Sequence, residues 1–257
     1  MTSAVSGRTA LVTGAGNGLG RAMSVALAEA GARVLLVGRD LAKLDGSAKL
    51  IADQGGAARA AVCDVADPAS VDALRAELAD EEVSVLVNNA GVAGPVKALV
   101  DVEPDEWDDV FAVNVRGAFL MCRAFLPPMI ERGRGDVVNV ASVSGKRPLV
   151  RRTPYCASKM ALIGLTTTLA AEVGPLGVTV NSLSPGPVRG PRMERNFRLE
   201  AERTGTTAEQ AERVFVSRSA LGRMVEEHEV AAALVAMLGM PGLCAADIDL
   251  SAGMVAR

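Results

Sequence analysis

A tyrosine and a lysine four positions apart, Tyr155 and Lys159, are the residues of this sequence best suited to chemistry. On a helix, residues four apart lie on one face, about one turn from each other. A phenol exchanges protons slowly near neutral pH because its ordinary pKa is ~10, and a neighbouring cation stabilises the phenolate. Tyr155 is also the only tyrosine of the chain. The pair therefore predicts a general acid or base rather than a core aromatic beside a solvated lysine.

A serine thirteen residues before the tyrosine, Ser142, stands where we expect a strand to end. A hydroxyl there can bond a substrate oxygen and stabilise developing charge. Hydride transfer to a carbonyl leaves an alkoxide, which needs both such a donor and a proton. Ser144 is a rival for this role, although its position fits less well.

A glycine-rich run, Thr13-Gly14-Ala15-Gly16-Asn17-Gly18-Leu19-Gly20, lies between an expected strand and an expected helix. Glycines let the backbone turn tightly and approach a pyrophosphate, which the N–H groups of the helix N-terminus then bind. Glycines also punctuate plain loops, so the flanking strand and helix decide between the two interpretations. The run predicts a dinucleotide site that includes Gly14, Asn17, Gly18, Leu19 and Gly20.

The second expected strand ends at Gly38, and Arg39 and Asp40 follow it. In dinucleotide-binding folds an acid at this point binds the ribose 2′-OH, whereas an arginine accommodates a 2′-phosphate with paired hydrogen bonds. Asp40 has the alternative role of capping the next helix, and Arg39 that of a solvated surface residue. We therefore expect NADP(H) as the preferred cofactor, with NAD(H) possible.

Short apolar runs alternate with helical stretches along the whole chain. This alternation predicts an α/β fold: a single Rossmann-type, doubly wound parallel sheet of about seven strands with helices on both faces. We expect one domain over 1–257, with a helical substrate lid at about 189–218. The expected strands are 8–13, 33–38, 57–63, 83–87, 136–140, 178–183 and 248–250. The first expected helix follows the glycine run and ends near 30. Four more cover 41–53, 67–79, 153–173 and 226–238. A long helix begins at 104, and Pro127-Pro128 disturbs it near its end.

Composition excludes several classes of protein. Aromatic residues make up only 3% of the 257 residues, so the core must consist of small and branched aliphatic side chains. A net charge of −3 argues against nucleic-acid binding. With one histidine and four widely spaced cysteines, we expect no metal site and four buried thiols in a reducing compartment. We find neither a secretory signal nor ~18 uninterrupted apolar residues, and expect a cytoplasmic protein without a membrane partner.

In this order and spacing, the motifs resemble the short-chain dehydrogenase/reductase family over nearly the whole chain, and especially its NADP-preferring, 3-oxoacyl reductase-like members. The motifs that carry the resemblance are TGAGNGLG at 13–20, Asp64, Asn88-Asn89-Ala90-Gly91, Asn114 in a long helix, Ser142, Tyr155-Cys156-Ala157-Ser158-Lys159 and Pro185-Gly186.

The resemblance implies an oxidoreductase that moves a hydride between NADP(H) or NAD(H) and a carbonyl or secondary alcohol. Asn114, Ser142, Tyr155 and Lys159 would form the catalytic set. Lys159 would also hold the nicotinamide ribose, and Asn114 would support a water that connects Lys159 to solvent. A homotetramer or homodimer is implied, with the helix of Tyr155 in an interface. The implied cofactor contacts beyond the glycine run are Arg39, Asp64, Val65, Asn88, Asn89, Ala90, Gly91, Tyr155, Lys159, Pro185, Gly186 and Val188.

Two stretches depart from the family's pattern. Gly190 stands where many relatives have a Thr or Ser that contacts the nicotinamide carboxamide, which would then depend on the Val188 backbone. Residues 245–253 read AADIDLSAG where relatives often have a glycine-rich segment that ends in Asp-Gly-Gly. That segment shapes the sheet edge and a subunit interface in the family.

Cations gather beside the expected reactive groups. Residues 146–152 hold four cations and no acid, and 189–218 adds seven arginines against five glutamates. Such cations can steer an anionic or thioester-linked substrate, with Arg151 and Arg152 nearest the tyrosine in sequence. A solvated loop or an interface salt-bridge cluster would have the same composition. Lid residues could equally cap an apolar ligand, through Phe197, Leu199, Val214 and Phe215.

Other functions fit part of the pattern. A dehydratase or epimerase uses this fold with a recycled nicotinamide, but it usually has a longer chain with an added substrate domain. A non-catalytic dinucleotide-sensing module would be expected to have lost part of the Asn/Ser/Tyr/Lys set, which is complete here. An NAD-preferring alcohol dehydrogenase would differ only in its cofactor.

Overall fold

The computed structural model describes residues 3–255 and is built around a parallel sheet. Its strands are β1 (Thr9–Thr13), β2 (Arg33–Gly38), β3 (Ala57–Val62), β4 (Val83–Asn88), β5 (Gly135–Val140), β6 (Val178–Pro185) and β7 (Asp247–Leu250). They lie in the order β3-β2-β1-β4-β5-β6-β7, and each neighbouring pair is parallel. Parallel pairing requires a crossover between strands, which a helix supplies. The predicted doubly wound sheet is confirmed.

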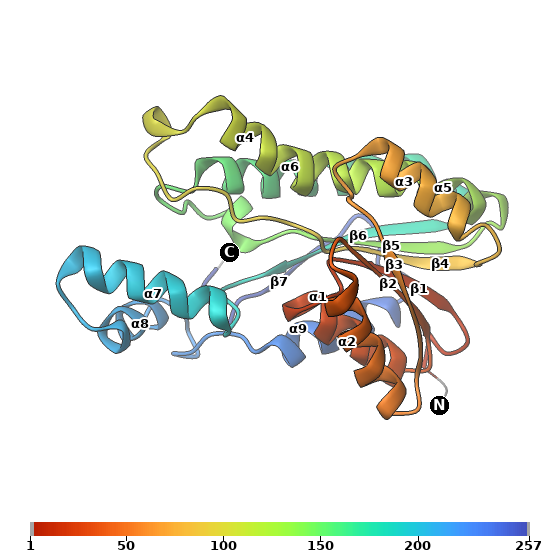
Figure 1. The fold of residues 1–257 in the computed structure, drawn as a ribbon, viewed down its shortest axis with the longest axis horizontal. Helices are drawn as coiled ribbons and strands as arrows, with labels where there is room; N and C mark the ends of the chain where they lie inside the picture. The colour runs from red at the N-terminus through yellow and green to blue at the C-terminus, as the bar shows by residue number, and fades with distance from the viewer. Residues whose placement is uncertain (1–2, 256–257) are drawn as a thin grey trace.

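Helices cover both faces of the sheet (Figure 1). They are α1 (Gly18–Glu29), α2 (Leu41–Asp53), α3 (Pro68–Glu77), α4 (Pro104–Phe111), α5 (Gly117–Glu131), α6 (Thr153–Val173), α7 (Pro191–Thr204), α8 (Ala208–Val216) and α9 (Glu227–Leu238). One face carries α1, α2 and α9, and the other α3, α4, α5 and α6. The pair α7 and α8 lies beyond the sheet, next to the carboxyl end of β6, where the lid was predicted.

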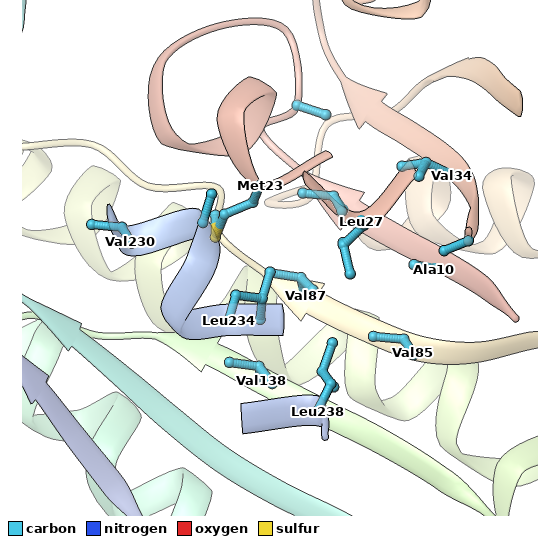
Figure 2. Close-up of a cluster of buried hydrophobic side chains, with 14 of the residues drawn as sticks. Ala10, Met23, Leu27, Val34, Val85, Val87, Val138, Val230, Leu234 and Leu238 are labelled. Atoms are coloured by element: carbon cyan, nitrogen blue, oxygen red, sulfur yellow. The ribbon is translucent and has the colours of Figure 1, made fainter. Parts of the chain in front are cut away.

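Alternating side chains of the strands form two cores, one under each helical layer. In β1, Ala10 and Val12 belong to the cluster that Figure 2 shows, where Leu27 of α1 and Leu234 of α9 pack on the sheet. Leu11 points to the opposite cluster, beneath α3 and α5. Each fully buried leucine of this kind stabilises the fold by about 1.5–3 kcal/mol. Aliphatic packing therefore fixes the strand ends, where the polar groups gather.

Aspartates begin two of the helices as their sequence suggests. Asp67 accepts hydrogen bonds from Ala69 N (3.1 Å) and Ser70 N (3.3 Å) at the start of α3, and Pro68 follows it. Asp40 accepts one from Lys43 N (3.2 Å) at the start of α2. At α6 the N-cap is Arg152, and its side chain makes no capping bond.

Two boundaries differ from the sequence prediction. The long helix continues through Pro127 and Pro128 to Glu131, because prolines in a last turn disturb only a few backbone bonds. The irregular part is instead a π-helical turn at Ala112–Arg116, between α4 and α5. Strand β6 extends to Pro185 because β7 pairs with its last residues, a contact that local sequence does not show.

The prediction of four buried thiols is wrong for two of them. Cys63 and Cys122 are buried, but Cys156 is half-buried and Cys244 is exposed in the segment before β7. Among residues 3–255, no group of three or more His, Cys, Asp or Glu side chains is placed to hold a metal ion. The stretch Pro104–Glu131 could cross a membrane by length and composition, but half of its most apolar window is buried. That burial is typical of the core helix of a soluble protein.

Candidate functional site

A cleft of about 780 Å³ lies along the carboxyl edge of the sheet. Its size is typical of a small-molecule or cofactor site, and carboxyl edges are where doubly wound sheets bind ligands. Most of the predicted site residues line it: Gly14, Asn17, Gly18, Leu19, Gly20, Arg39, Asp64, Val65, Asn89, Ala90, Gly91, Ser142, Tyr155, Lys159, Pro185, Gly186 and Val188. The structure therefore brings the glycine run and the reactive groups into one cavity.

The glycine run forms a tight turn in which Gly14, Gly16 and Gly20 have no space for a side chain. Gly14 has φ of +68°, a conformation that favours glycine. A Cβ on Gly20 would lie 2.1 Å from the Gly14 carbonyl oxygen. Arg21 donates to the Gly16 carbonyl (2.5 Å) and to Ser47 Oγ (3.0 Å), which ties the turn to α2. The backbone is thus fixed, and it leads directly into the N-terminus of α1, as phosphate binding requires.

Thr13, which we did not select as a site residue, joins the turn to the end of β4. Its hydroxyl oxygen accepts hydrogen bonds from the backbone N–H groups of Asn89 and Ala90, each at 3.0 Å. Asn89 returns a bond from Nδ2 to the Thr13 carbonyl oxygen (2.8 Å). A hydroxyl residue at the strand end, directly before the first glycine, was the available signal. These bonds hold the two strand ends that form the centre of the cleft.

Asn88 is not among the residues that line the cleft, so its predicted place in the cleft lining is wrong. Its side chain is buried behind the sheet, where Nδ2 donates to Asn139 Oδ1 (2.9 Å) and to Cys122 Sγ (3.3 Å). Burial raises the pKa of the Cys122 thiol to about 12, and the bond from Asn88 partly offsets this effect. Asn88 is the last residue of β4, and Asn89, which follows the strand, lines the cleft instead.

The proposed proton-transfer residues converge at the end of β5. The buried Lys159 donates from Nζ to the Val140 carbonyl oxygen (2.8 Å), and Nζ lies 5.8 Å from the centre of the Tyr155 ring. The Ser142 hydroxyl donates to the Pro185 carbonyl oxygen (3.4 Å). Ser144, its rival, also lines the cleft, and its backbone N–H donates to Ser142 Oγ (3.1 Å) and so orients that hydroxyl.

Asn114 lies behind the cleft wall, in the π-helical turn. Its Oδ1 accepts from Val92 N (2.7 Å), and its Nδ2 donates to Val92 O (3.0 Å) and to Ser158 Oγ (3.0 Å). A Cβ on Gly91 would lie 3.1 Å from Asn114 Oδ1 and 3.5 Å from Lys159 Nζ. Asn114 Oδ1 and Lys159 Nζ thus lie on the same side of Gly91, near each other. Such π-helical insertions are frequent at functional sites.

Two cations line the end of the cleft that lies near β2. The Arg39 side chain is 69% exposed, and its Nη1 lies 4.0 Å from Asp64 Oδ2. Lys43 Nζ lies 2.8 Å from Asp40 Oδ2, and this bond lowers the pKa of the Asp40 carboxyl. Asp40 also caps α2, so helix capping by Asp40 is compatible with phosphate binding by Arg39. An exposed guanidinium beside an ammonium suits a phosphate group.

The family departures have structural reasons. Gly190 has φ of +153°, which side chains rarely adopt, so a threonine there would be strained. Val188 forms a bridge to Val225 through its neighbours, because Arg189 N donates to Val225 O and Val225 N donates to Pro187 O. The amide of Val188 takes no part in those two bonds. Gly186 lies against Ser251, where a Cβ would meet its Cα at 2.8 Å.

The apolar residues of the lid segment divide between its interior and its surface. Phe197 packs edge-on against Phe215, with 5.5 Å between ring centres, in a small core with Ala211 and Met224. Of the four apolar residues considered from the sequence, Phe215 lines the cleft, whereas Leu199 and Val214 are exposed. Met193 and Asn196 of α7 also line the cleft, and nothing in the sequence had selected them.

Comparison with known proteins agrees with this geometry. Residues 8–202 match the family described as short chain dehydrogenase. D-threitol dehydrogenase of Mycolicibacterium smegmatis is 41% identical over 181 residues, which cover 70% of this chain and 69% of that protein. A candidate ketoacyl reductase of the granaticin polyketide synthase of Streptomyces violaceoruber is 39% identical over 227 residues, with coverage of 87% and 83%. A variant actinorhodin polyketide ketoreductase solved with NADPH has a TM-score of 0.92 and 32% identity, over 99% of each chain.

Proposed function

Because the chain belongs to the short chain dehydrogenase family, we propose that it moves a hydride between NADP(H) and a carbonyl or secondary alcohol, with Tyr155 as the proton donor or acceptor. The predicted family and oxidoreductase activity are confirmed. The residue roles and the preference for NADP(H) over NAD(H) are our proposals. One observation supports them most directly: Tyr155, Lys159 and Ser142 line the same cleft as the glycine turn.

The residues present fit a dinucleotide. Glycines close the turn where side chains would fill the space, and Arg39 and Lys43 stand at the end suited to a 2′-phosphate. Asn89, Ala90 and Gly91 line the centre of the cleft, and Pro185, Gly186 and Val188 lie opposite. When bound, the cofactor supplies or accepts the hydride. Binding of NADPH in the actinorhodin ketoreductase supports the same assignment here.

The side chains of this chain then have separate tasks. The Ser142 hydroxyl bonds the substrate oxygen and positions it. In the reductive direction the Tyr155 hydroxyl gives its proton to that oxygen, and in the oxidative direction the phenolate accepts it. The Lys159 ammonium, held by Val140, stabilises the phenolate form. Asn114 would support a water that connects Lys159 to solvent, through which a proton can return.

A panel of ketones, aldehydes and secondary alcohols tests this function, with the absorbance of reduced nicotinamide followed for NADPH and NADH in parallel. We expect turnover with at least one carbonyl class. Tyr155→Phe should lower kcat by about 10²–10⁴-fold, whereas titration of NADPH fluorescence should show unchanged binding. Dinucleotide binding without turnover of any compound would instead identify a dinucleotide-sensing module, and near-normal turnover by Tyr155→Phe would contradict the mechanism.

The proposal includes a homotetramer or homodimer in which α5 and α6 pack against a second subunit. Phe119 of α5 and Met160 of α6 support it, because each is a large apolar side chain that is 47% exposed. It also includes a single domain over 1–257, with α7 and α8 as a substrate lid. Light scattering coupled to size exclusion tests the assembly, and a monomer at micromolar concentration would contradict it. Cytoplasmic location stays a prediction.

A further inference from the structure

Four arginines line the part of the cleft that the β5–α6 loop and the lid contribute. They are Arg147 and Arg152 of the loop, Arg189 at the start of the lid segment, and Arg218, which follows α8. Among the described residues, three carboxylates line the cleft: Asp40 and Asp64 lie beside Arg39, and Glu227 lies near Gly18 and Gly190, at the start of the lid segment. Arginines therefore outnumber carboxylates in the part of the cleft that the loop and the lid contribute.

Three other cations of these segments are held by other groups, and of these Arg189 also lines the cleft. Lys146 forms ion pairs with Asp247 (2.5 Å) and Asp249. Arg189 pairs with glutamates of α8 and of the α9 N-cap, at 3.1 and 3.0 Å. Arg151 is exposed, has φ of +64°, and donates to the Val96 carbonyl oxygen (3.2 Å). Lys146 and Arg151 thus lie outside the cleft lining, and Arg189 lines the cleft but binds two glutamates. Arg147, Arg152 and Arg218 are the other arginines of these segments that line it, among the side chains that the structure describes.

Arg152 is the most enclosed of the three, with 9% of its surface exposed. Its guanidinium donates to the Ala93 carbonyl oxygen (3.2 Å) and to Asn196 Oδ1 (3.2 Å). These two bonds hold the side chain between the cleft wall and the lid helix α7. A planar guanidinium in a fixed position suits a carboxylate or phosphate, because it can donate two parallel hydrogen bonds.

Arg152 lies close to Tyr155 along the chain. It is the N-cap of α6, three residues before Tyr155, which is ~5 Å along the helix axis. Arg147 enters from the turn that follows Ser142, and Arg218 from the lid. Arg203 binds Glu200 at 2.6 Å and lowers the pKa of that carboxyl, and the charges of Arg151 and Arg218 also contribute to this shift. Arg147 and Arg152 follow Ser142 and precede Tyr155 closely in the chain, whereas Arg218 belongs to the lid segment.

We propose that Arg147, Arg152 and Arg218 form an anion subsite, and that the substrates are short oxo or hydroxy acids or their phosphate counterparts. The carboxylate or phosphate would lie about one helical turn from the carbonyl that Tyr155 protonates. This inference rests on the proposed hydride transfer and names the substrate class of the same site.

Matched pairs of ketones that differ only in charge test the inference: acetoacetate and acetoacetamide, levulinate and levulinamide, and dihydroxyacetone phosphate and dihydroxyacetone. Steady-state rates with NADPH give kcat/KM for each compound. We expect the anionic member of at least one pair to be preferred by about tenfold or more, as charge-assisted hydrogen bonds allow. The pairs also show whether a carboxylate or a phosphate is bound.

Variants then assign the preference to the arginines. Arg152→Gln and Arg147→Gln should each raise KM for the preferred anion by about tenfold and leave kcat/KM for its neutral partner within about twofold. Arg152→Lys should restore part of the preference, since it keeps the charge but not the paired donors. Arg151→Gln is the matched control, because that neighbouring arginine lies outside the cleft lining, and it should behave as the unmodified protein.

The outcomes separate this inference from the proposed function. Equal kcat/KM for charged and neutral partners in the unmodified protein would overturn the anion subsite alone. An equal decrease of kcat/KM for the anionic and the neutral ketone in Arg147→Gln and Arg152→Gln would overturn the anion subsite as well. If Arg152→Gln does not fold, Arg147→Gln and Arg218→Gln still decide the question. No turnover of any ketone, despite NADPH binding, would overturn the proposed function and this inference with it.

Discussion

The ammonium group of Lys159 donates a 2.8 Å hydrogen bond to the carbonyl oxygen of Val140. Val140 is the last residue of β5, and Lys159 lies in the second turn of α6. The bond therefore joins the helix that carries Tyr155 to the strand that leads to Ser142. A buried ammonium needs such a partner, and this one fixes the charge 5.8 Å from the centre of the tyrosine ring.

Replacement of Lys159 should lower the rate of catalysis much more than the stability of the fold. Lys159→Met should lower kcat by about 10²–10⁴-fold, because the phenolate loses its neighbouring cation. The free energy of unfolding should change little or rise, since an apolar side chain of similar size replaces a buried charge. Rates with NADPH and urea unfolding check the two effects. A large loss of stability would instead indicate that the Val140 bond mainly holds the fold together.

A second prediction concerns the glycine turn. Gly20→Ala places a methyl group 2.1 Å from the Gly14 carbonyl oxygen and 2.6 Å from Asn89 Nδ2. The backbone must shift, so we expect a loss of about 1–3 kcal/mol or more and NADPH binding weakened by at least tenfold, roughly the worth of one or two phosphate contacts. NADPH fluorescence titration and thermal unfolding measure the two quantities.

Gly46→Ala is the matched control for that change. Gly46 lies within α2, and a Cβ there would approach nothing closer than Arg21 Nη2 at 3.9 Å. Because alanine favours a helix over glycine by about 0.5–1 kcal/mol, this variant should be more stable and bind NADPH normally. Equal effects of the two substitutions would contradict the importance of the turn geometry.

A third prediction concerns cofactor choice. Arg39→Ala should reduce kcat/KM with NADPH by about tenfold or more, the expected value of a charge-assisted phosphate contact. Values with NADH should change little, because the 2′-hydroxyl offers no charge to the guanidinium. Lys43→Ala should shift the same ratio by a smaller factor, since Lys43 is held by Asp40. An NADPH to NADH ratio that is unchanged in Arg39→Ala would remove the proposed NADP(H) preference.

Most of the sheet could be predicted because local patterns decide it. Strands such as β2 and β4 are continuous β-branched and aliphatic runs, and Asp67-Pro68 begins α3 as expected. The π-helical turn could not be predicted, because its cause is distant: Asn114 binds the backbone of Val92, 22 residues earlier in the chain. The longer β6 likewise depends on pairing with β7.

Some residues of the site could likewise be predicted from the sequence, and others could not. Residues in contiguous motifs, such as Gly14 and Tyr155, were found because their spacing carries the chemistry. The distinction between Asn88 and Asn89 depends on where β4 ends, because Asn88 is its last residue and is buried, whereas Asn89 follows it and lines the cleft. Arg151 differs from Arg152 in its positive φ. Each of these pairs consists of two identical neighbouring residues, so the sequence alone does not distinguish them. Asn196 reaches the cleft through the placement of α7, which no motif encodes.

The last prediction concerns the anchor of the loop that follows Ser142. Lys146 bridges Asp247 and Asp249 of β7, and Asp247 also accepts hydrogen bonds from Ser182 (2.8 Å) and Ser184 (2.7 Å). Lys146→Met leaves two half-buried carboxylates side by side without their cation. We expect a loss of about 3 kcal/mol in the free energy of unfolding, together with a lower kcat, because the turn at Val143–Gly145 orients the Ser142 hydroxyl.

A compensated variant checks the cause of that loss. Combining Lys146→Met with Asp247→Asn and Asp249→Asn removes all three charges, so it should recover most of the stability, since breaking a pair is more harmful than removing it entirely. The activity should recover less, because the loop is no longer tied to β7. Urea unfolding and steady-state rates on the three-residue and one-residue variants provide the comparison. If the compensated variant is as unstable as Lys146→Met, the loss comes from packing of the lysine stem and not from unpaired carboxylates.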